Sequence, residues 1–254
     1  MRLSRLLSRL LSTLVVALAL PLAAAAQQLT VSAAASLTDA FKELGPKFEA
    51  AHPGATLRFN FAASGALLQQ ISQGAPVDVF ASADQETLDR AVAQKLVDPA
   101  TRRNFVTNSL VLIEPAQGGA GVKSLADLRG PAVRKIAVGK TATVPVGRYT
   151  QQVLDGAGLW GPLEPKFVQA DSVRQVLDYV SRGEAEAGFV YATDAAIARD
   201  KVHVVLTASG HTPVSYPVAV VADSKQPKLA ADFVGFLTGE PAQQILGKYG
   251  FGKP

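Results

Sequence analysis

From residue 29 onward the chain alternates between strand-like and helix-like segments, and this alternation limits its possible folds more than any other feature. Residues 29–35 (LTVSAAA) predict a strand, and Leu37, Phe41, Leu44 and Phe48 then recur at helical spacing. Such alternation predicts an α/β protein in which mostly parallel sheets are flanked by helices. In these sheets, ligands bind at the carboxyl ends of the strands, next to the N-termini of helices.

The full pattern leaves room for two lobes, because 254 residues exceed what one compact sheet layer needs. Further strands are predicted at 56–62, 77–81, 108–115, 135–139, 166–170, 186–191, 202–206 and 215–221. Further helices are predicted at 67–71, 84–95, 145–157, 171–182, 226–237 and 239–248. Neither an internal repeat nor a low-complexity tract is evident beyond residue 26.

Residues 1–26 predict a cleavable signal peptide and export to the periplasm. The segment begins with Arg2, Arg5 and Arg9, continues with the apolar run LSTLVVALALPL and ends in the small residues AAAAQQ. The apolar run is shorter than the span of about 20 residues that crosses a bilayer. A membrane anchor is therefore the less favoured alternative, and the absence of cysteine excludes a lipid-anchored lipoprotein.

The net charge of +4 does not indicate a nucleic-acid or membrane partner. The three arginines of residues 1–26 account for most of the excess of 25 Lys and Arg over 21 Asp and Glu. Without that segment the chain is close to neutral. The chain has no cysteine, so it forms no disulfide despite its predicted export.

A search for a catalytic motif finds nothing that favours an enzyme. His52, His203 and His211 are far apart, and no metal-ligand spacing, nucleophile elbow, phosphate loop or dinucleotide fingerprint occurs. A secreted hydrolase that uses Ser36 or Ser64 is the alternative from another class, and it would need a general base.

Small or hydroxylated residues recur where a predicted strand meets a predicted helix. Ser36, Ser64, Val146, Val173 and Tyr191 all hold such positions. Helix N-termini carry unpaired N–H groups and about half a positive charge, so several that converge can bind an anion without lysine or arginine. Serine and tyrosine hydroxyls add neutral donors. The alternative is that these residues are ordinary helix caps.

Two local capping patterns accompany these junctions. Ser36 and Asp39 have the spacing of a capping box, in which Asp replaces the usual Glu or Gln. Either Asp171 or Ser172 could cap the helix that begins near Val173.

The region from residue 28 to 254 resembles the periplasmic molybdate-binding proteins of bacterial ABC importers, a family of type II periplasmic binding proteins. The segments that carry the resemblance are AAASLTDAF, GAPVDVFASAD, NSLVLI, VPVGRY, GFVYATDA, YPVAVV and the terminal KYGF, in this order. The resemblance implies a non-enzymatic receptor without a cofactor that delivers molybdate, and also tungstate, to an inner-membrane permease.

The resemblance also implies the site and the lobes. Ser36 and Ser64 would bind the oxyanion from one lobe, Val146 and Val173 would offer backbone N–H groups from the other, and Tyr191 would donate its phenol. Molybdenum would be bound only as its oxyanion. The lobes would be 27–107 with 216–254, and 108–215, and the protein would be a monomer.

Ligand chemistry leaves alternatives open at this stage. Molybdate carries no proton at neutral pH, so a site made only of donors suits it, whereas phosphate keeps a proton part of the time. Sulfate is also free of protons, and the sequence does not reveal the size of the cavity. Ferric iron would need clustered tyrosines, histidines or carboxylates, and the five tyrosines are scattered along the chain.

Overall fold

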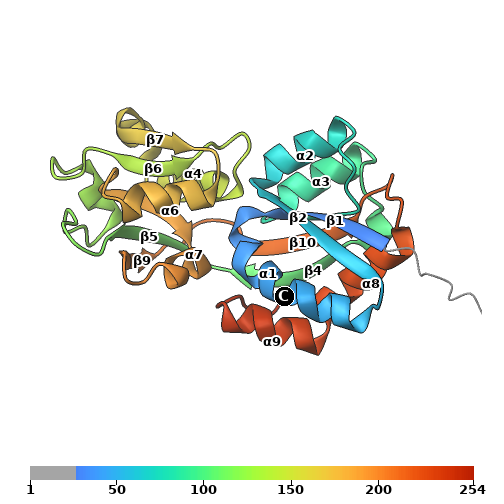
Figure 1. Ribbon diagram of the computed structural model, residues 1–254. Coiled ribbons are helices and arrows are strands. Elements are labelled where there is room, and N and C mark those ends of the chain that lie inside the picture. Colours follow the sequence, from blue (N-terminus) through green and yellow to red (C-terminus); the bar gives the residue numbers. More distant parts are fainter. Residues whose placement is uncertain (1–26) are drawn as a thin grey trace, which may run out of the picture.

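The computed structural model describes residues 27–254, so the predicted signal peptide lies outside the described residues. Figure 1 shows two lobes, each built on one sheet, with the described N-terminus and the C-terminus in the same lobe. The strands are β1 Gln27–Ala34, β2 Ala55–Ala62, β3 Val79–Ala81, β4 Arg103–Asn108, β5 Leu110–Pro115, β6 Ile136–Gly139, β7 Phe167–Ala170, β8 Ala187–Tyr191, β9 Val202–Thr207 and β10 Val214–Val220. The α-helices are α1 Thr38–Ala51, α2 Ser64–Ser72, α3 Gln85–Ala93, α4 Pro145–Gly156, α5 Trp160–Leu163, α6 Val173–Ser181, α7 Ala192–Ile197, α8 Pro227–Thr238 and α9 Glu240–Lys248.

Each lobe has a five-stranded sheet with one strand that runs against the others. The first lobe has the strand order β2-β1-β3-β10-β4, and β10 is antiparallel to both of its neighbours. The second lobe has the order β7-β6-β8-β5-β9, with β5 as the antiparallel strand. The predicted two-lobed α/β fold with mostly parallel sheets is therefore confirmed.

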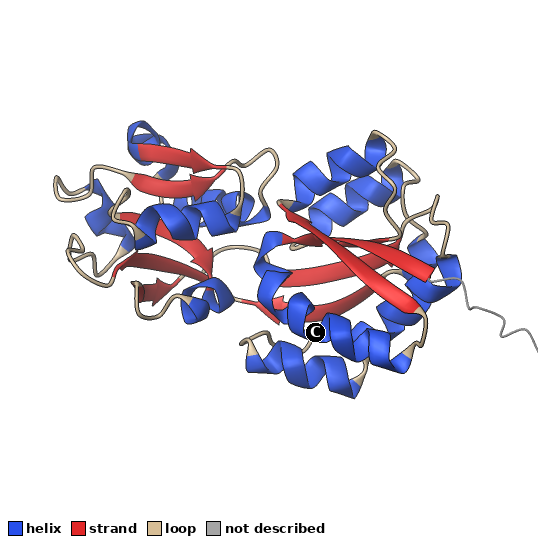
Figure 2. Ribbon diagram, viewed as in Figure 1, coloured by secondary structure: helices blue, strands red, loops and turns tan. Residues whose placement is uncertain are grey.

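The chain passes between the lobes twice. The first passage is the single residue Ser109 between β4 and β5, and the second is the segment 208–213 between β9 and β10. Both antiparallel strands, β5 and β10, begin directly after a passage. Figure 2 shows these thin connections between the two sheets.

The predicted strands and long helices are present, with ends that differ by a few residues, and two elements were missed. Strand β4 reads RNFVTN and has only Phe105 and Val106 as apolar residues, because it is the edge strand of its sheet. Helix α5 is a single turn, too short to show a period.

Helices cover both faces of the first sheet, and their apolar contacts with the sheet form the core of the first lobe. Phe41 and Phe48 from α1 pack edge to face or at a tilt against Phe233 and Phe236 of α8 and Phe105 of β4. On the other face, α2 and α3 enclose a second buried cluster around Phe80 and Ala219. The carboxyl ends of β1 and β2 are thereby held toward the second lobe (Figure 1).

In the second lobe, close backbone packing sets the position of α4. A Cβ atom on Gly147 would lie 2.1 Å from the carbonyl oxygen of Gly139 at the end of β6. Only glycine allows this approach, and it places the N-terminus of α4 at the carboxyl end of β6. Within residues 27–254, none of the helices has the length and apolar character that crossing a bilayer requires.

Candidate functional site

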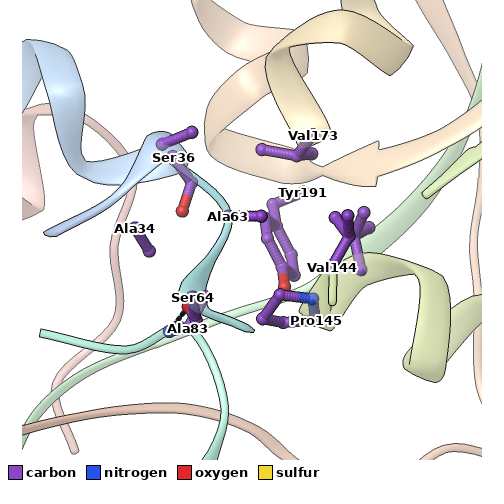
Figure 3. A pocket seen from close by; sticks show the side chains of 11 residues that line it. Ala34, Ser36, Ala63, Ser64, Ala83, Val144, Pro145, Val173 and Tyr191 are labelled. Atoms are coloured by element: carbon purple, nitrogen blue, oxygen red, sulfur yellow. Dashed lines mark hydrogen bonds between the residues drawn. The ribbon is translucent and has the colours of Figure 1, made fainter. Parts of the chain in front are cut away.

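A small cavity lies where the two lobes meet, and all five residues predicted to bind a ligand line it. The cavity is small: a volume of about 10 Å³ is open to the centre of a water molecule, which is close to the room that one water needs. As it stands, the cavity therefore admits only a compact ligand. Figure 3 shows the hydroxyl of Ser36 and the phenol of Tyr191 among the lining side chains. The lining residues are Ala34, Ala35, Ser36, Ala63, Ser64, Ala83, Val144, Pro145, Val146, Val173 and Tyr191.

The first lobe contributes the ends of two neighbouring parallel strands. Ser36 lies in a single 3-10 turn, Ala35–Leu37, directly after β1, and Ser64 is the first residue of α2, directly after β2. Because β1 and β2 pair in parallel up to Ala34 and Ala62, both serines emerge at one edge of the sheet. Both are buried.

The second lobe contributes two helix starts and a strand end. Val146 is the second residue of α4, after Pro145, and Val173 is the first residue of α6. At these positions their N–H groups have no carbonyl partner inside their own helices. Tyr191 ends β8, and its buried side chain reaches the cavity.

The predicted capping box at Ser36 is wrong. The residue before α1 is Leu37, and no side chain caps this helix. The 3-10 turn carries Ser36 away from the cap position, and Asp39 pairs instead with Arg174 of the second lobe at 2.7 Å. At α6 the cap is Ser172, whose hydroxyl accepts from the N–H of Gln175 at 3.2 Å.

Two of the three cavity hydroxyls, those of Ser64 and Tyr191, have a proton that no described residue accepts. Ser64 Oγ accepts from the N–H of Ala83 at 3.0 Å, which is the dashed line in Figure 3. Ser36 Oγ lies 2.9 Å from the hydroxyl of Tyr216. Tyr191 Oη is buried and has no hydrogen-bond partner among the described residues. A ligand that accepts hydrogen bonds would satisfy these groups.

The phenols near the cavity remain protonated donors. Burial raises the pKa of Tyr191 well above its ordinary value, and the neighbouring phenol of Tyr216 adds to the effect. Burial likewise raises the pKa of Tyr216 well above its ordinary value. The rings of these two tyrosines come from different lobes and meet edge to face, with centroids 5.8 Å apart.

The cations nearest the cavity are held outside it by carboxylates of the opposite lobe. Arg148 of α4 donates from Nε to Asp84 at 2.9 Å and also reaches Thr87 at 2.7 Å. Arg174 of α6 pairs with Asp39 at 2.7 Å. Among the described residues, those that line the cavity include no charged side chain, so the site offers neutral donors only.

Asp194 fixes the second of these arginines from within its own lobe. Its carboxylate is fully buried, accepts from Nε of Arg174 at 2.6 Å and also accepts from the N–H of Tyr191 at 3.3 Å. Burial raises the pKa of Asp194 to about 6, and Arg174 opposes the rise. At neutral pH the carboxylate is therefore ionised and holds Arg174 in place.

The alternatives to anion binding lack their chemistry. Neither Ser36 nor Ser64 bonds to a histidine: His52 stacks on Phe48, and His203 faces Glu114 at 3.4 Å. His211 bonds only to backbone carbonyls. Residues 27–254 contain no group of three His, Cys, Asp or Glu side chains that could hold a metal ion.

The structure corrects the description of the tyrosines as scattered. Tyr149, Tyr191 and Tyr216 lie in a row, with neighbouring ring centroids 6.4 Å and 5.8 Å apart. Burial raises the pKa of each, so all three are neutral phenols in the ligand-free protein.

Sequence reasoning missed the residues that support the cavity without lining it. No local motif marks these residues, which are Asn108, Tyr216, Arg148 and Arg174. Most of their side-chain contacts are with residues 61 or more positions away in the sequence. The segments VPVGRY and YPVAVV do contain Arg148 and Tyr216, which is the one signal that could have pointed to them.

Two α/β lobes with a donor-lined cavity at their junction define a solute-binding protein rather than an enzyme. The chain belongs to the family of bacterial extracellular solute-binding proteins, which matches residues 29–252.

Individual relatives agree with this assignment. The chain is 39% identical to the molybdate-binding protein ModA of Escherichia coli over 233 residues, or 88% of each chain. It is 38% identical to ModA of Mycobacterium tuberculosis over 231 residues, which cover 90% of this chain and 86% of that one. The solved periplasmic molybdate-binding protein of Azotobacter vinelandii has the same fold, with 24% identity, a TM-score of 0.76 and coverage of 89% and 99% of the two chains.

The unpartnered phenol gives a stability prediction for the ligand-free protein. Tyr191→Phe removes a buried hydroxyl that has no internal partner, so we expect the free energy of unfolding to stay the same or rise by up to about 1 kcal/mol. Tyr216→Phe, the matched change, removes a hydroxyl with two partners and should lower it by about 1–2 kcal/mol. Urea denaturation checks both values, and a clear loss of stability in Tyr191→Phe would show that this hydroxyl has a partner in solution.

Proposed function

We propose that this chain captures molybdate, and tungstate in the same way, and delivers it to the permease of an ABC importer. Ser36 and Ser64 bind the oxyanion from the first lobe. The N–H groups of Val146 and Val173 and the phenol of Tyr191 bind it from the second. Molybdenum enters as its oxyanion and meets no direct protein ligand.

The observation that carries this proposal is that the hydroxyls of Ser64 and Tyr191 face the cavity without an internal acceptor for their protons. The N–H of Ala83 donates to Ser64, and the side chain of Tyr191 finds no partner in the described protein. A tetrahedral oxyanion supplies four acceptor oxygens for the donors that line the cavity. The relatives named for molybdate binding favour this anion over others of the same shape.

Charge and proton count separate the candidate anions. Molybdate, tungstate and sulfate are free of protons at neutral pH and accept from every donor. Hydrogen phosphate carries a proton that needs an acceptor, and the oxygen of Ser64 already accepts from the N–H of Ala83. Sulfate is the second candidate, since it differs from molybdate mainly in size.

The remaining parts of the proposal concern the whole receptor. The lobes comprise 27–107 with 216–254, and 108–215; these boundaries lie within two residues of the end of β4 at Asn108 and the start of β10 at Val214. Closure is a hinge motion at the two passages that buries the anion. Residues 1–26 direct export to the periplasm, and the receptor acts there as a monomer without a nucleic-acid partner.

Calorimetric titration with four anions tests the function directly. We expect micromolar or tighter binding of molybdate and tungstate, with phosphate failing to bind and sulfate much weaker. The reason is that the donors disfavour a protonated oxygen, and the relatives named for molybdate binding favour the larger anions over sulfate. Sulfate affinity equal to that of molybdate would replace the proposal with its second candidate.

The two kinds of donor predict different responses to substitution. Ser36→Ala removes a donated hydroxyl and should weaken molybdate binding by about 1–2 kcal/mol. Val173→Ala keeps the backbone N–H and should change the affinity little. Titration of both variants against the parent checks this contrast, and a large loss in a folded Val173→Ala would contradict the backbone role.

A substitution at a glycine of the lobe junction would test what happens when the two lobes cannot come together fully. The N–H of Gly65 donates to the carbonyl of Thr143 in the other lobe at 2.9 Å, and a Cβ on Gly65 would lie 2.6 Å from that oxygen. Gly65→Ala should therefore weaken molybdate binding about tenfold or more, with the melting temperature of the ligand-free protein nearly unchanged.

Gly235→Ala is the control for this variant, because its Cβ meets nothing within 4 Å on helix α8 of the same lobe. It should leave the affinity unchanged. Full affinity in Gly65→Ala would mean that the bound lobes are further apart than the contact between Gly65 and Thr143 requires.

A further inference from the structure

Tyr216 and Asn108 do not line the cavity, yet Tyr216 contacts Ser36, which does, and Asn108 contacts Tyr216. Tyr216 is fully buried on β10 of the first lobe. Asn108 is the last residue of β4, directly before the passage into the second lobe. Their hydrogen bonds determine which group at Ser36 faces the ligand.

The amide of Asn108 has one orientation. The N–H of Ser109 can only donate, and it lies 2.9 Å from Oδ1 of Asn108. Nδ2 of Asn108 therefore faces the other way, where it donates to Thr193 at 2.9 Å and to the hydroxyl oxygen of Tyr216 at 3.3 Å.

The hydroxyl of Tyr216 then has one satisfactory arrangement. Its oxygen accepts from Asn108, and its own proton needs an acceptor. Among residues 27–254 the acceptor within hydrogen-bond distance is Ser36 Oγ, at 2.9 Å. If Ser36 donated instead, a buried O–H of Tyr216 would be left without a partner, which is unfavourable.

We propose that Tyr216, oriented by Asn108, is a positioning residue that directs the proton of Ser36 to the cavity and so favours ligand oxygens that carry no proton. The proton of Tyr216 occupies a lone pair of Ser36, and the proton of Ser36 points to the cavity. This inference rests on the proposed oxyanion function and names what sets its selectivity.

Ser64 provides an internal comparison. Its oxygen accepts from the backbone N–H of Ala83 at 3.0 Å, so its hydroxyl is also committed to donate. A side-chain substitution does not remove that backbone donor. The donor at Ser36 comes from a side chain and can be removed, which makes the effect testable at one serine while the other stays fixed.

The first test is a double-mutant cycle of Tyr216→Phe and Ser36→Ala, read by molybdate titration. If Tyr216 acts through Ser36, Tyr216→Phe weakens binding about three- to tenfold in the parent and has almost no effect when Ser36 is already alanine. Tyr149→Phe is the matched control, since it removes a neighbouring buried phenol that does not contact Ser36. Equal effects of Tyr216→Phe in both backgrounds would overturn the proposal.

The second test reads selectivity, which a purely structural role would not change. At about pH 8 phosphate and molybdate are both dianions, and only phosphate carries a proton. Tyr216→Phe frees a lone pair of Ser36, so the ratio of phosphate to molybdate affinity should rise at least about threefold. Asn108→Asp goes further, because its carboxylate takes the proton of Tyr216, and Tyr216 then accepts from Ser36. An unchanged ratio in both folded variants would overturn the proposal.

The outcomes separate this inference from the function on which it rests. If the parent binds sulfate and not molybdate, the ligand assignment fails, and the same cycle with sulfate still measures the role of Tyr216. If the parent binds molybdate but the cycle is additive, the role of Tyr216 fails alone. Preferential binding of phosphate by the parent would overturn both.

Discussion

The neutrality of the cavity depends on two ion pairs that cross the lobe junction. Arg148 and Arg174 lie beside the helix starts that face the cavity, and an unpaired guanidinium there would bind any anion. Asp84, itself buried, holds Arg148, and Asp39 holds Arg174. The arginines therefore join the lobes and leave recognition to hydroxyl and N–H groups, which can discriminate by geometry and by proton count.

The same arrangement couples closure to the ligand. In the closed form Tyr191 buries a hydroxyl without a partner, and an unsatisfied buried donor costs about 1–3 kcal/mol. The ion pairs and the contact between Gly65 and Thr143 favour closure and offset part of that cost. A bound oxyanion removes the cost by accepting from the donors, so it shifts the population toward the closed form.

The sequence predicts the fold better than it predicts the residues that support the site from behind. The regular spacing of apolar residues reveals every long helix. The edge strand β4 is missed because few of its residues are buried. The five predicted residues lie where a strand ends or a helix begins, and the pattern of the chain points to such junctions. Tyr216 and Asn108 are missed because their role depends on hydrogen bonds between distant segments. The capping box at Ser36 is wrong because a 3-10 turn intervenes before α1.

The two lobes supply donors of different kinds, and this has a consequence for specificity. Val146 and Val173 would donate through the backbone, so their side chains are free to vary while the N–H direction is set by α4 and α6. Ser36 and Ser64 donate through hydroxyls that can rotate, and a rotating hydroxyl can also accept. Each is fixed by a donor behind it, so the selectivity for proton-free anions resides in the second layer of the first lobe.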